Sequence, residues 1–222
     1  MAAVTKKSPI TCLFLDIGGV LLTNGWDHGI RKRVAQHFKL DWTEMEDRHN
    51  LTFDTYEEGK ITLRDYLDRV IFYKKRTFAF AEFRSFMFAQ SKPCAPMLEL
   101  IPRLKAKYGL KIIVVSNESR ELNSHRIRTF KLDRFVDSFI SSCYVHIRKP
   151  DTDLFRVALD MAQAPVRQVL YIENTPMFVQ VAENLGIRSI LHTDYHSTKA
   201  KLAALGLPDE ADANRGLSAQ GE

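Results

Sequence analysis

The sequence has no apolar run that approaches the length needed to span a lipid bilayer. Residues 1–9 also lack the apolar stretch of a secretory signal peptide. Cysteine is scarce. Cys12, Cys94 and Cys143 are odd in number, far apart and surrounded by apolar residues, which is typical of buried free thiols. These absences disfavour a membrane-spanning protein and a disulfide-rich scaffold, and they predict a cytoplasmic location.

The composition is that of an ordinary globular protein. Its 222 residues allow one α/β core with a modest insertion, and 45% hydrophobic and 27% charged residues are unremarkable proportions. The formal net charge of +5 suits an anionic substrate and would also suit nucleic acid. Because a merely basic surface explains the charge equally well, we predict neither a nucleic-acid nor a membrane partner.

Strand and helix patterns alternate along most of the chain. Short runs rich in Val, Ile, Leu and aromatic residues predict strands at residues 11–15, 111–115, 168–172 and 188–191, with a weaker candidate at 138–141. Between the later runs, helical patterns occupy residues 97–108, 120–130, 152–161 and 176–185. This alternation predicts a doubly wound parallel sheet in an α/β fold.

One stretch interrupts the alternation, because residues 27–90 are helical in pattern throughout. We predict a small helical cap there, inserted after the first strand. The core would then comprise residues 10–26 and 91–207, with disordered termini at 1–9 and 208–222. Within the cap, residues 72–88 interleave aromatic and basic residues. Such a stretch can bind single-stranded nucleic acid, but packing of the cap explains it more simply.

Polar residues follow several of the predicted strands. Asp16 with Gly18 and Gly19, Ser116 with Asn117, and Glu173 with Asn174 each come directly after a strand, and Lys149 precedes a helix. In an open α/β sheet the carboxyl ends of the strands form the ligand site. Two carboxylates there repel each other unless a cation lies between them, and Mg²⁺ is the natural candidate. Each residue alone could be a helix cap or a surface residue, so the predicted site depends on their common location.

These four segments, in this order, resemble the four motifs of the haloacid dehalogenase superfamily, and the resemblance extends from Thr11 to about Leu207. Residues 56–62 in the cap are similar to a segment in a branch that contains sugar-phosphate phosphatases and the N-terminal phosphatase domain of soluble epoxide hydrolases. The resemblance implies a Rossmann-like core with a small cap. It also implies Mg²⁺-dependent hydrolysis of a small phosphorylated metabolite, which could be a sugar phosphate.

The resemblance also implies a role for each motif residue. Asp16 would attack phosphorus and form an aspartyl-phosphate, with Lys149 neutralising the charge that develops. Phosphate oxygens would be bound by Ser116, Asn117 and Gly19. Mg²⁺ would be held by Asp16, the backbone carbonyl of Gly18 and Glu173, with Asn174 orienting its neighbours.

The sequence departs from the family pattern at Gly18. Most phosphatases of the superfamily carry a second aspartate there, which acts as the general acid and base. One explanation is a phosphatase whose proton is handled by water, a cap residue or the substrate itself. A second is a metal-independent 2-haloacid dehalogenase, which would need an arginine such as Arg31, Arg33 or Arg48. A third is a non-catalytic binding or regulatory module, to which Glu173 in place of the more usual aspartate adds some weight.

Overall fold

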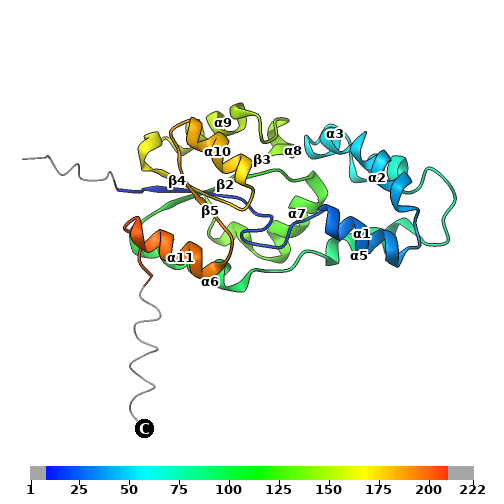
Figure 1. Ribbon diagram of the computed structural model, residues 1–222, viewed down its shortest axis with the longest axis horizontal. Helices are drawn as coiled ribbons and strands as arrows, with labels where there is room; N and C mark the ends of the chain where they lie inside the picture. Colours follow the sequence, from blue (N-terminus) through cyan, green and yellow to red (C-terminus); the bar gives the residue numbers. More distant parts are fainter. Residues whose placement is uncertain (1–8, 210–222) are drawn as a thin grey trace, which may run out of the picture.

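The computed structural model describes residues 9–209 (Figure 1). Its centre is a sheet of five parallel strands in the order β3-β2-β1-β4-β5. The strands are β1 (Cys12–Leu15), β2 (Lys111–Ser116), β3 (Ser138–Ser141), β4 (Val169–Glu173) and β5 (Arg188–Leu191). Because β1 pairs with both β2 and β4, the chain winds outward from it in two directions. This arrangement confirms the predicted doubly wound α/β fold, including the weakest predicted strand.

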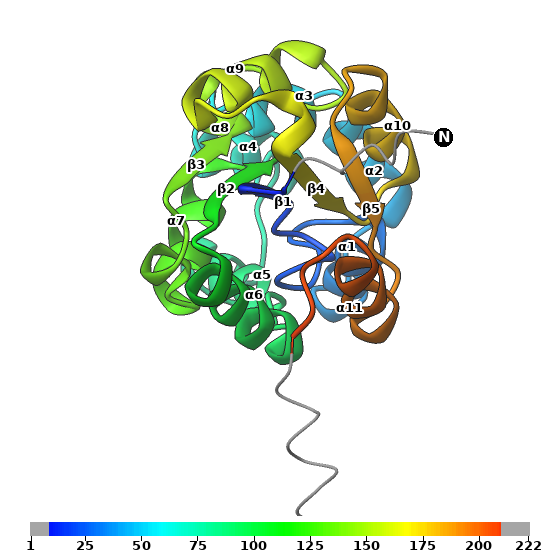
Figure 2. The same ribbon diagram turned by 90° about the vertical axis from the view of Figure 1, so that its left-hand side faces the viewer.

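Helices cover both faces of the sheet (Figure 2). One face carries α6 (Ala95–Tyr108), α7 (Arg120–Thr129) and α11 (Tyr195–Ala204), and the other carries α9 (Thr152–Ala162) and α10 (Pro176–Asn184). Shorter pieces lie in the connections, namely α8 (Ser142–Val145), η1 (Leu132–Arg134) and η2 (Val166–Gln168). Along β1, Leu13 and Leu15 pack on the α6 side, whereas Cys12 and Phe14 pack on the α9 side. Burial of both faces explains why the strands are apolar almost throughout.

The helical insertion follows β1, as predicted. It comprises α1 (His28–His37), α2 (Trp42–Asn50), α3 (Phe53–Glu57), α4 (Leu63–Val70) and α5 (Phe80–Ala89). These helices enclose an aromatic core of their own, in which Phe83 and Met87 are fully buried and Phe38 packs between Phe78 and Phe83. The phenylalanines of residues 72–88 therefore serve cap packing, and Lys74 of the basic run forms an ion pair with Glu44 at 3.0 Å.

Hydrogen bonds join the cap to the core beside α8. Ser142 Oγ donates to the backbone carbonyl of Glu57 at 2.7 Å, and His146 Nδ1 donates to that of Glu58, also at 2.7 Å. Directly after these two cap residues the chain turns at Gly59, which has a φ of +66°. A Cβ at Gly59 would lie 2.3 Å from the carbonyl oxygen of Cys143. Glycine is thus required there both by the left-handed backbone and by the close approach of the core.

Within residues 9–209, no helix combines the length and apolar character needed to cross a membrane. The predicted disordered termini lie outside the described residues except for residues 9, 208 and 209. Of these, Asp209 forms an ion pair with Arg103 at 2.8 Å. The boundaries proposed between core and cap remain a prediction.

Gly59→Ala and Gly109→Ala form a matched pair that measures the cap contact. Both glycines have left-handed backbones, with φ of +66° and +65°, but nothing lies within 4 Å of a Cβ at Gly109. We expect Gly109→Ala to lower the free energy of unfolding by about 1–2 kcal/mol, which is the usual cost of that backbone for alanine. Gly59→Ala should cost roughly 1–3 kcal/mol more, because a neighbour must also shift. Equal losses in urea denaturation would contradict the proposed cap contact.

Candidate active site

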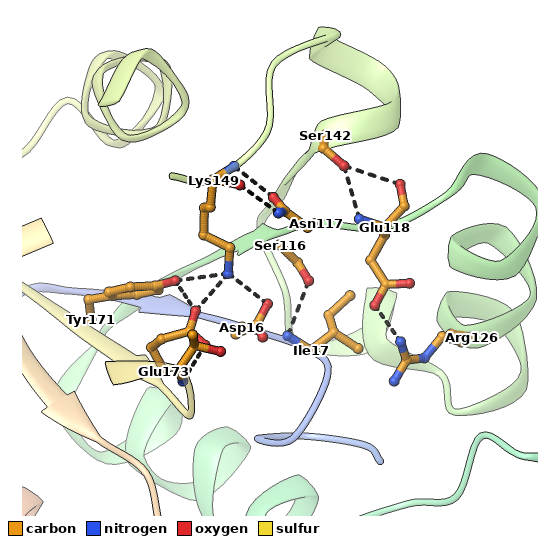
Figure 3. A network of polar contacts seen from close by, with 11 residues as sticks. Asp16, Ile17, Ser116, Asn117, Glu118, Arg126, Ser142, Lys149, Tyr171 and Glu173 are labelled. Carbon is orange, nitrogen blue, oxygen red and sulfur yellow. Dashed lines mark hydrogen bonds and ion pairs between the residues drawn. The ribbon is translucent and has the colours of Figure 1, made fainter. Parts of the chain in front are cut away.

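The four predicted segments meet at the carboxyl edge of the sheet (Figure 3). Asp16 directly follows β1, and its N–H continues the ladder by donating to the Ile172 carbonyl of β4 at 3.1 Å. Ser116 ends β2 and Glu173 ends β4, so these side chains flank Asp16 from its two neighbouring strands. Lys149, after α8, reaches into the same cluster. The strand order thus brings together residues that are up to 157 positions apart in sequence.

A single ammonium group holds the two carboxylates together. Lys149 Nζ lies 3.1 Å from Asp16 Oδ1, 2.6 Å from Glu173 Oε2 and 3.0 Å from the hydroxyl of Tyr171. Lys149 is 1% exposed. Burial by itself would lower the pKa of Lys149, but Asp16 and Glu173 more than compensate and raise it above its ordinary value. The lysine is therefore a buried permanent cation, with all three of its N–H donors occupied.

Tyr171 belongs to the site although the sequence analysis missed it. Its hydroxyl donates to Glu173 Oε2 and accepts from Lys149 Nζ. Burial, with the nearby charges of Glu173 and Asp16, raises the pKa of Tyr171 well above its usual range, so the phenol stays protonated. Tyr171 lies two residues before Glu173 on β4, and side chains two apart on a strand share a face. The two-residue spacing from Glu173 could therefore have identified Tyr171 from the sequence.

Asp16 combines burial with incomplete charge compensation. Its exposed fraction is 7%, and burial followed by the charge of Glu173 raises the pKa of Asp16 to about 6. Lys149 and a hydrogen bond from Ser116 act in the opposite direction. The Ser116 hydroxyl oxygen also faces the N–H of Ile17 at 3.5 Å. A carboxylate held in this way is poorly solvated, which favours its reaction as a nucleophile.

The side chain of Asn117 fixes the backbone of Lys149. Its Oδ1 accepts from the Lys149 N–H at 2.8 Å, and its Nδ2 donates to the Lys149 carbonyl at 2.9 Å. The predicted contact of the Asn117 N–H with phosphate remains a prediction.

The backbone N–H of Gly19 is not free to bind a ligand in this structure, because it already donates to the Leu22 carbonyl at 2.7 Å. A Cβ at Gly19 would lie 2.2 Å from Nδ2 of Asn174.

The proposed magnesium ligands fit a hard cation. One terminal atom of the Asn174 amide lies 2.9 Å from Glu173 Oε1 and 3.0 Å from the Gly18 carbonyl oxygen. As nitrogen, that atom donates to both oxygens. As oxygen, it would add a third oxygen donor within about 3 Å of each of the other two, and oxygen donors are what Mg²⁺ prefers. No cluster of three or more His, Cys, Asp and Glu side chains suited to a metal occurs among residues 9–209. The site would therefore use the two carboxylates Asp16 and Glu173 with neutral oxygens, as Mg²⁺ sites commonly do.

A cavity of about 270 Å³ lies between this cluster and the cap. Core residues of the motifs and Trp26 line it together with Phe53, Tyr56 and Glu57 from the cap. Of the three arginines named for a dehalogenase, only Arg31 lines it. The Arg31 guanidinium is already bonded to Glu46, at 2.9 Å through Nε, and to the Trp26 carbonyl at 2.7 Å.

Two further buried residues of this cavity, Glu118 and Arg126, were also missed. They form an ion pair with side-chain exposed fractions of 3% and 1%. Glu118 lies two residues after Ser116, in the short segment before the predicted helix at 120–130, to which the sequence assigned no role. Arg126 lies on α7 and also donates to the carbonyl of Thr23, which is 103 residues away in sequence.

A family model described as haloacid dehalogenase-like hydrolase matches residues 29–192, which is more than half of the chain. The match includes Ser116, Lys149 and Glu173 but begins after Asp16. The assignment of Asp16 therefore depends on the geometry described above.

Known proteins similar to the chain agree with this family. A putative pyrophosphatase PpaX from Caldanaerobacter subterraneus subsp. tengcongensis is 29% identical over 92 residues, 41% of each chain. Bifunctional epoxide hydrolase 2 from Sus scrofa is 28% identical over 102 residues, which is 45% of this chain and 18% of the relative. The matches thus span less than half of these relatives. The fold is shared by an enzyme, bt-2542 from Bacteroides thetaiotaomicron, solved with magnesium and inorganic phosphate. Its TM-score is 0.68 at 20% identity, covering 82% of this chain and 93% of that one.

We expect Asp16→Asn to stabilise the protein near neutral pH when metal is absent. The folded-state pKa of Asp16, about 6, lies above its ordinary value of 3.8, so ionised Asp16 disfavours folding at higher pH. The gain should be of the order of 1–3 kcal/mol at about pH 7.5 and should vanish below about pH 4, where the carboxyl is protonated in both states. Urea denaturation in EDTA at the two pH values measures it. A loss of stability at neutral pH would contradict the charge balance assigned to the site.

Proposed function

The chain belongs to the haloacid dehalogenase-like hydrolase family, and from this membership we propose that it is a Mg²⁺-dependent phosphatase. Its substrate would be a small phosphorylated metabolite, hydrolysed through an aspartyl-phosphate on Asp16. The observation that carries the proposal is the position of the Asp16 carboxylate. Lys149 holds it at the carboxyl edge of the sheet, 3.1 Å from Nζ, beside the oxygens of Glu173 and Gly18.

The residues of the chain divide the chemistry among them. Asp16 attacks phosphorus while the leaving oxygen departs, and water then attacks the same phosphorus and frees the Asp16 carboxylate. Ser116 and the N–H of Asn117, near the start of α7, hold phosphoryl oxygens. Lys149 compensates the negative charge on Asp16 throughout and needs no reorganisation, because Asn117 and Tyr171 already fix its position.

The metal would be held by Asp16, the Gly18 carbonyl and Glu173, with Asn174 at its side. When bound, Mg²⁺ would supply positive charge that brings the phosphoryl group and the Asp16 carboxylate together despite their like charges. Glu173 Oε2 is occupied by Lys149 and Tyr171, so Oε1 is the oxygen that faces the metal position.

The size of the cavity favours a small substrate. Ligand pockets usually measure about 300–1,000 Å³, and this one is near the lower limit at about 270 Å³. Phe53, Tyr56 and Glu57 of the cap line it together with the motif residues, and closure of such a cap over a substrate would exclude water from the site. A sugar phosphate with its phosphate on the anomeric oxygen would suit a site without the second aspartate, because such a leaving group is weakly basic.

The dehalogenase alternative receives less support from the side chains. It requires a free arginine for the halide and carboxylate, whereas Arg31 is bonded to Glu46 and to the Trp26 carbonyl. Arg33 is exposed, and Arg48 stacks on Tyr73 at 3.5 Å from the ring centroid. The acidic Glu173 beside Asp16 is also better suited to a metal site.

Phosphate release from a panel of sugar phosphates, alkyl phosphates and an aryl phosphate tests the proposal. We expect turnover with Mg²⁺, none with EDTA, and a loss of at least ~10⁴-fold in Asp16→Asn, because the nucleophile is removed. Within the panel, sugar 1-phosphates should be favoured over alkyl phosphates. Halide release from 2-haloacids in EDTA would support the dehalogenase instead, and silence in both assays would indicate a non-catalytic module.

Binding of Mg²⁺ provides a test that does not depend on turnover. We expect saturating Mg²⁺ to raise the Tm of the wild type, since a ligand at 100 times its Kd stabilises by about 2.7 kcal/mol. Asp16→Asn should lose most of this rise. Asp133→Asn is the matched control, because Asp133 is an exposed carboxylate on η1, away from the site. Equal Tm shifts in all three proteins would contradict the metal site.

A further inference from the structure

An asparagine and an arginine lie next to Gly18 on the side where a Cβ would extend. A Cβ at Gly18 would lie 3.2 Å from Asn24 Oδ1 and 4.0 Å from Arg126 Nη1. At Gly25 a Cβ would lie 2.8 Å from the same Nη1 and 2.9 Å from Leu122 Cδ2, so a side chain there would force these neighbours to shift. Two glycines thus make room for one guanidinium, at the position where a second aspartate would otherwise extend from residue 18.

Arg126 in turn holds a carboxylate. Its Nη1 donates to Glu118 and its Nη2 to the Thr23 carbonyl, while its buried Nε has no hydrogen-bond partner among residues 9–209. The Glu118 backbone is fixed as well, since its N–H donates to Ser142 Oγ at 3.0 Å. Glu118 and Arg126 line the same cavity as Asp16, and Figure 3 shows the Glu118 carboxylate beside Ser116 and Ile17.

We propose that Glu118 is the acid–base residue of the reaction, held by Arg126 in the room that Gly18 and Gly25 leave. This assignment rests on the proposed phosphatase activity. As Asp16 attacks and the phosphorus–oxygen bond breaks, Glu118 gives its proton to the leaving oxygen, which departs as an alcohol. Glu118, now a carboxylate, then takes a proton from the water that attacks the aspartyl-phosphate. Asp16 is released as a carboxylate, phosphate leaves, and Glu118 is protonated again.

The electrostatic surroundings suit this exchange. Burial is the largest cause that raises the pKa of Glu118 to about 7, and the negative charges of Asp16 and Glu57 raise it further. The positive charges of Arg126 and Lys149 act in the opposite direction. At neutral pH a group of this kind both gives and takes a proton readily. The Arg126 guanidinium stays charged and cannot perform this step.

Glu57 is the natural comparison. It also lines the cavity, and burial raises its pKa to about 7 as well. Its carboxylate, however, extends from α3 of the cap and bonds to Arg148, at 2.9 Å through Nε, rather than to the guanidinium beside Gly18. Glu57→Gln therefore removes a second carboxyl with a raised pKa, 13% exposed against 3% for Glu118, from the cap side of the same cavity.

The experiment compares Glu118→Gln with Glu57→Gln on an alkyl phosphate and on p-nitrophenyl phosphate. We expect Glu118→Gln to lose ~10²–10⁴-fold in kcat/KM with the alkyl phosphate but tenfold or less with the aryl phosphate, whose leaving group needs no proton. The variant should release a burst of p-nitrophenol and accumulate phosphorylated enzyme, because hydrolysis of the intermediate also lacks its base. Glu57→Gln should change kcat/KM for both substrates by the same factor.

The pH profile provides a second readout. In the wild type, kcat/KM for the alkyl phosphate should fall as pH rises above about 7, because the acid loses its proton. This basic limb should be absent in Glu118→Gln and present in Glu57→Gln. If Glu57→Gln removes the limb, or if Glu118→Gln leaves both the limb and the leaving-group preference unchanged, the assignment is overturned.

Folding is controlled with a double variant. Glu118→Gln leaves the buried Arg126 unpaired, which is typically destabilising, whereas Glu118→Gln/Arg126→Met removes both charges and should fold. That double variant should show the same loss of the basic limb, with a near-ultraviolet circular dichroism spectrum like that of the wild type. A wild type that releases no phosphate from any substrate overturns the proposed function itself. An active wild type with an unaffected double variant overturns only the role of Glu118.

Discussion

One buried ammonium group between two carboxylates is the interaction on which the site depends. Without Lys149, Asp16 and Glu173 would be two negative charges at the edge of a dry sheet, which is among the costliest arrangements in a protein interior. With it, the pair can be buried, and Asp16 keeps a raised pKa and an incompletely satisfied carboxylate. In the proposed mechanism this poorly solvated carboxylate is the nucleophile. Asn117 and Tyr171 keep the cation in place from its backbone and from its ammonium group.

The fold supplies this arrangement at little cost. The three central strands β1, β2 and β4 are buried over nearly their whole length, and a polar residue ends or directly follows each of them. Because the strands are parallel, these polar residues lie at one edge of the sheet. The cap is then required for a separate reason: it covers the cavity from the solvent side with its aromatic residues. Its contacts with the core near Gly59 and Ser142 lie beside the loop that continues to Lys149. The position of the cap and the position of Lys149 are thus linked through the same short segment.

The sequence was sufficient for the residues that follow strands. Asp16, Ser116 and Glu173 could be predicted to meet because strand ends are readable from apolar runs, and all five predicted strands are present. Glu118, Arg126 and Tyr171 could not be found in this way. From the sequence alone, Arg126 is expected to be an exposed residue of a helix. Its burial depends on a contact with Thr23, which lies 103 positions earlier in the chain. The two hydrogen bonds between the Asn117 side chain and the Lys149 backbone likewise depend on a loop conformation that no local sequence pattern predicts. Long-range packing around Gly18 and Gly25, rather than any motif, places Glu118 and Arg126 beside the site, where we propose that Glu118 takes over the role of the family's second aspartate.

The central claim is that Asp16 forms a covalent phosphoryl intermediate. Enzyme quenched with acid during turnover of p-nitrophenyl phosphate in Mg²⁺ can be digested and searched by mass spectrometry for a phosphorylated peptide. We predict one phosphoryl group, on the peptide that contains Asp16, which disappears when the substrate is exhausted. Steady turnover with no label on Asp16, or with label on another residue, would contradict the account.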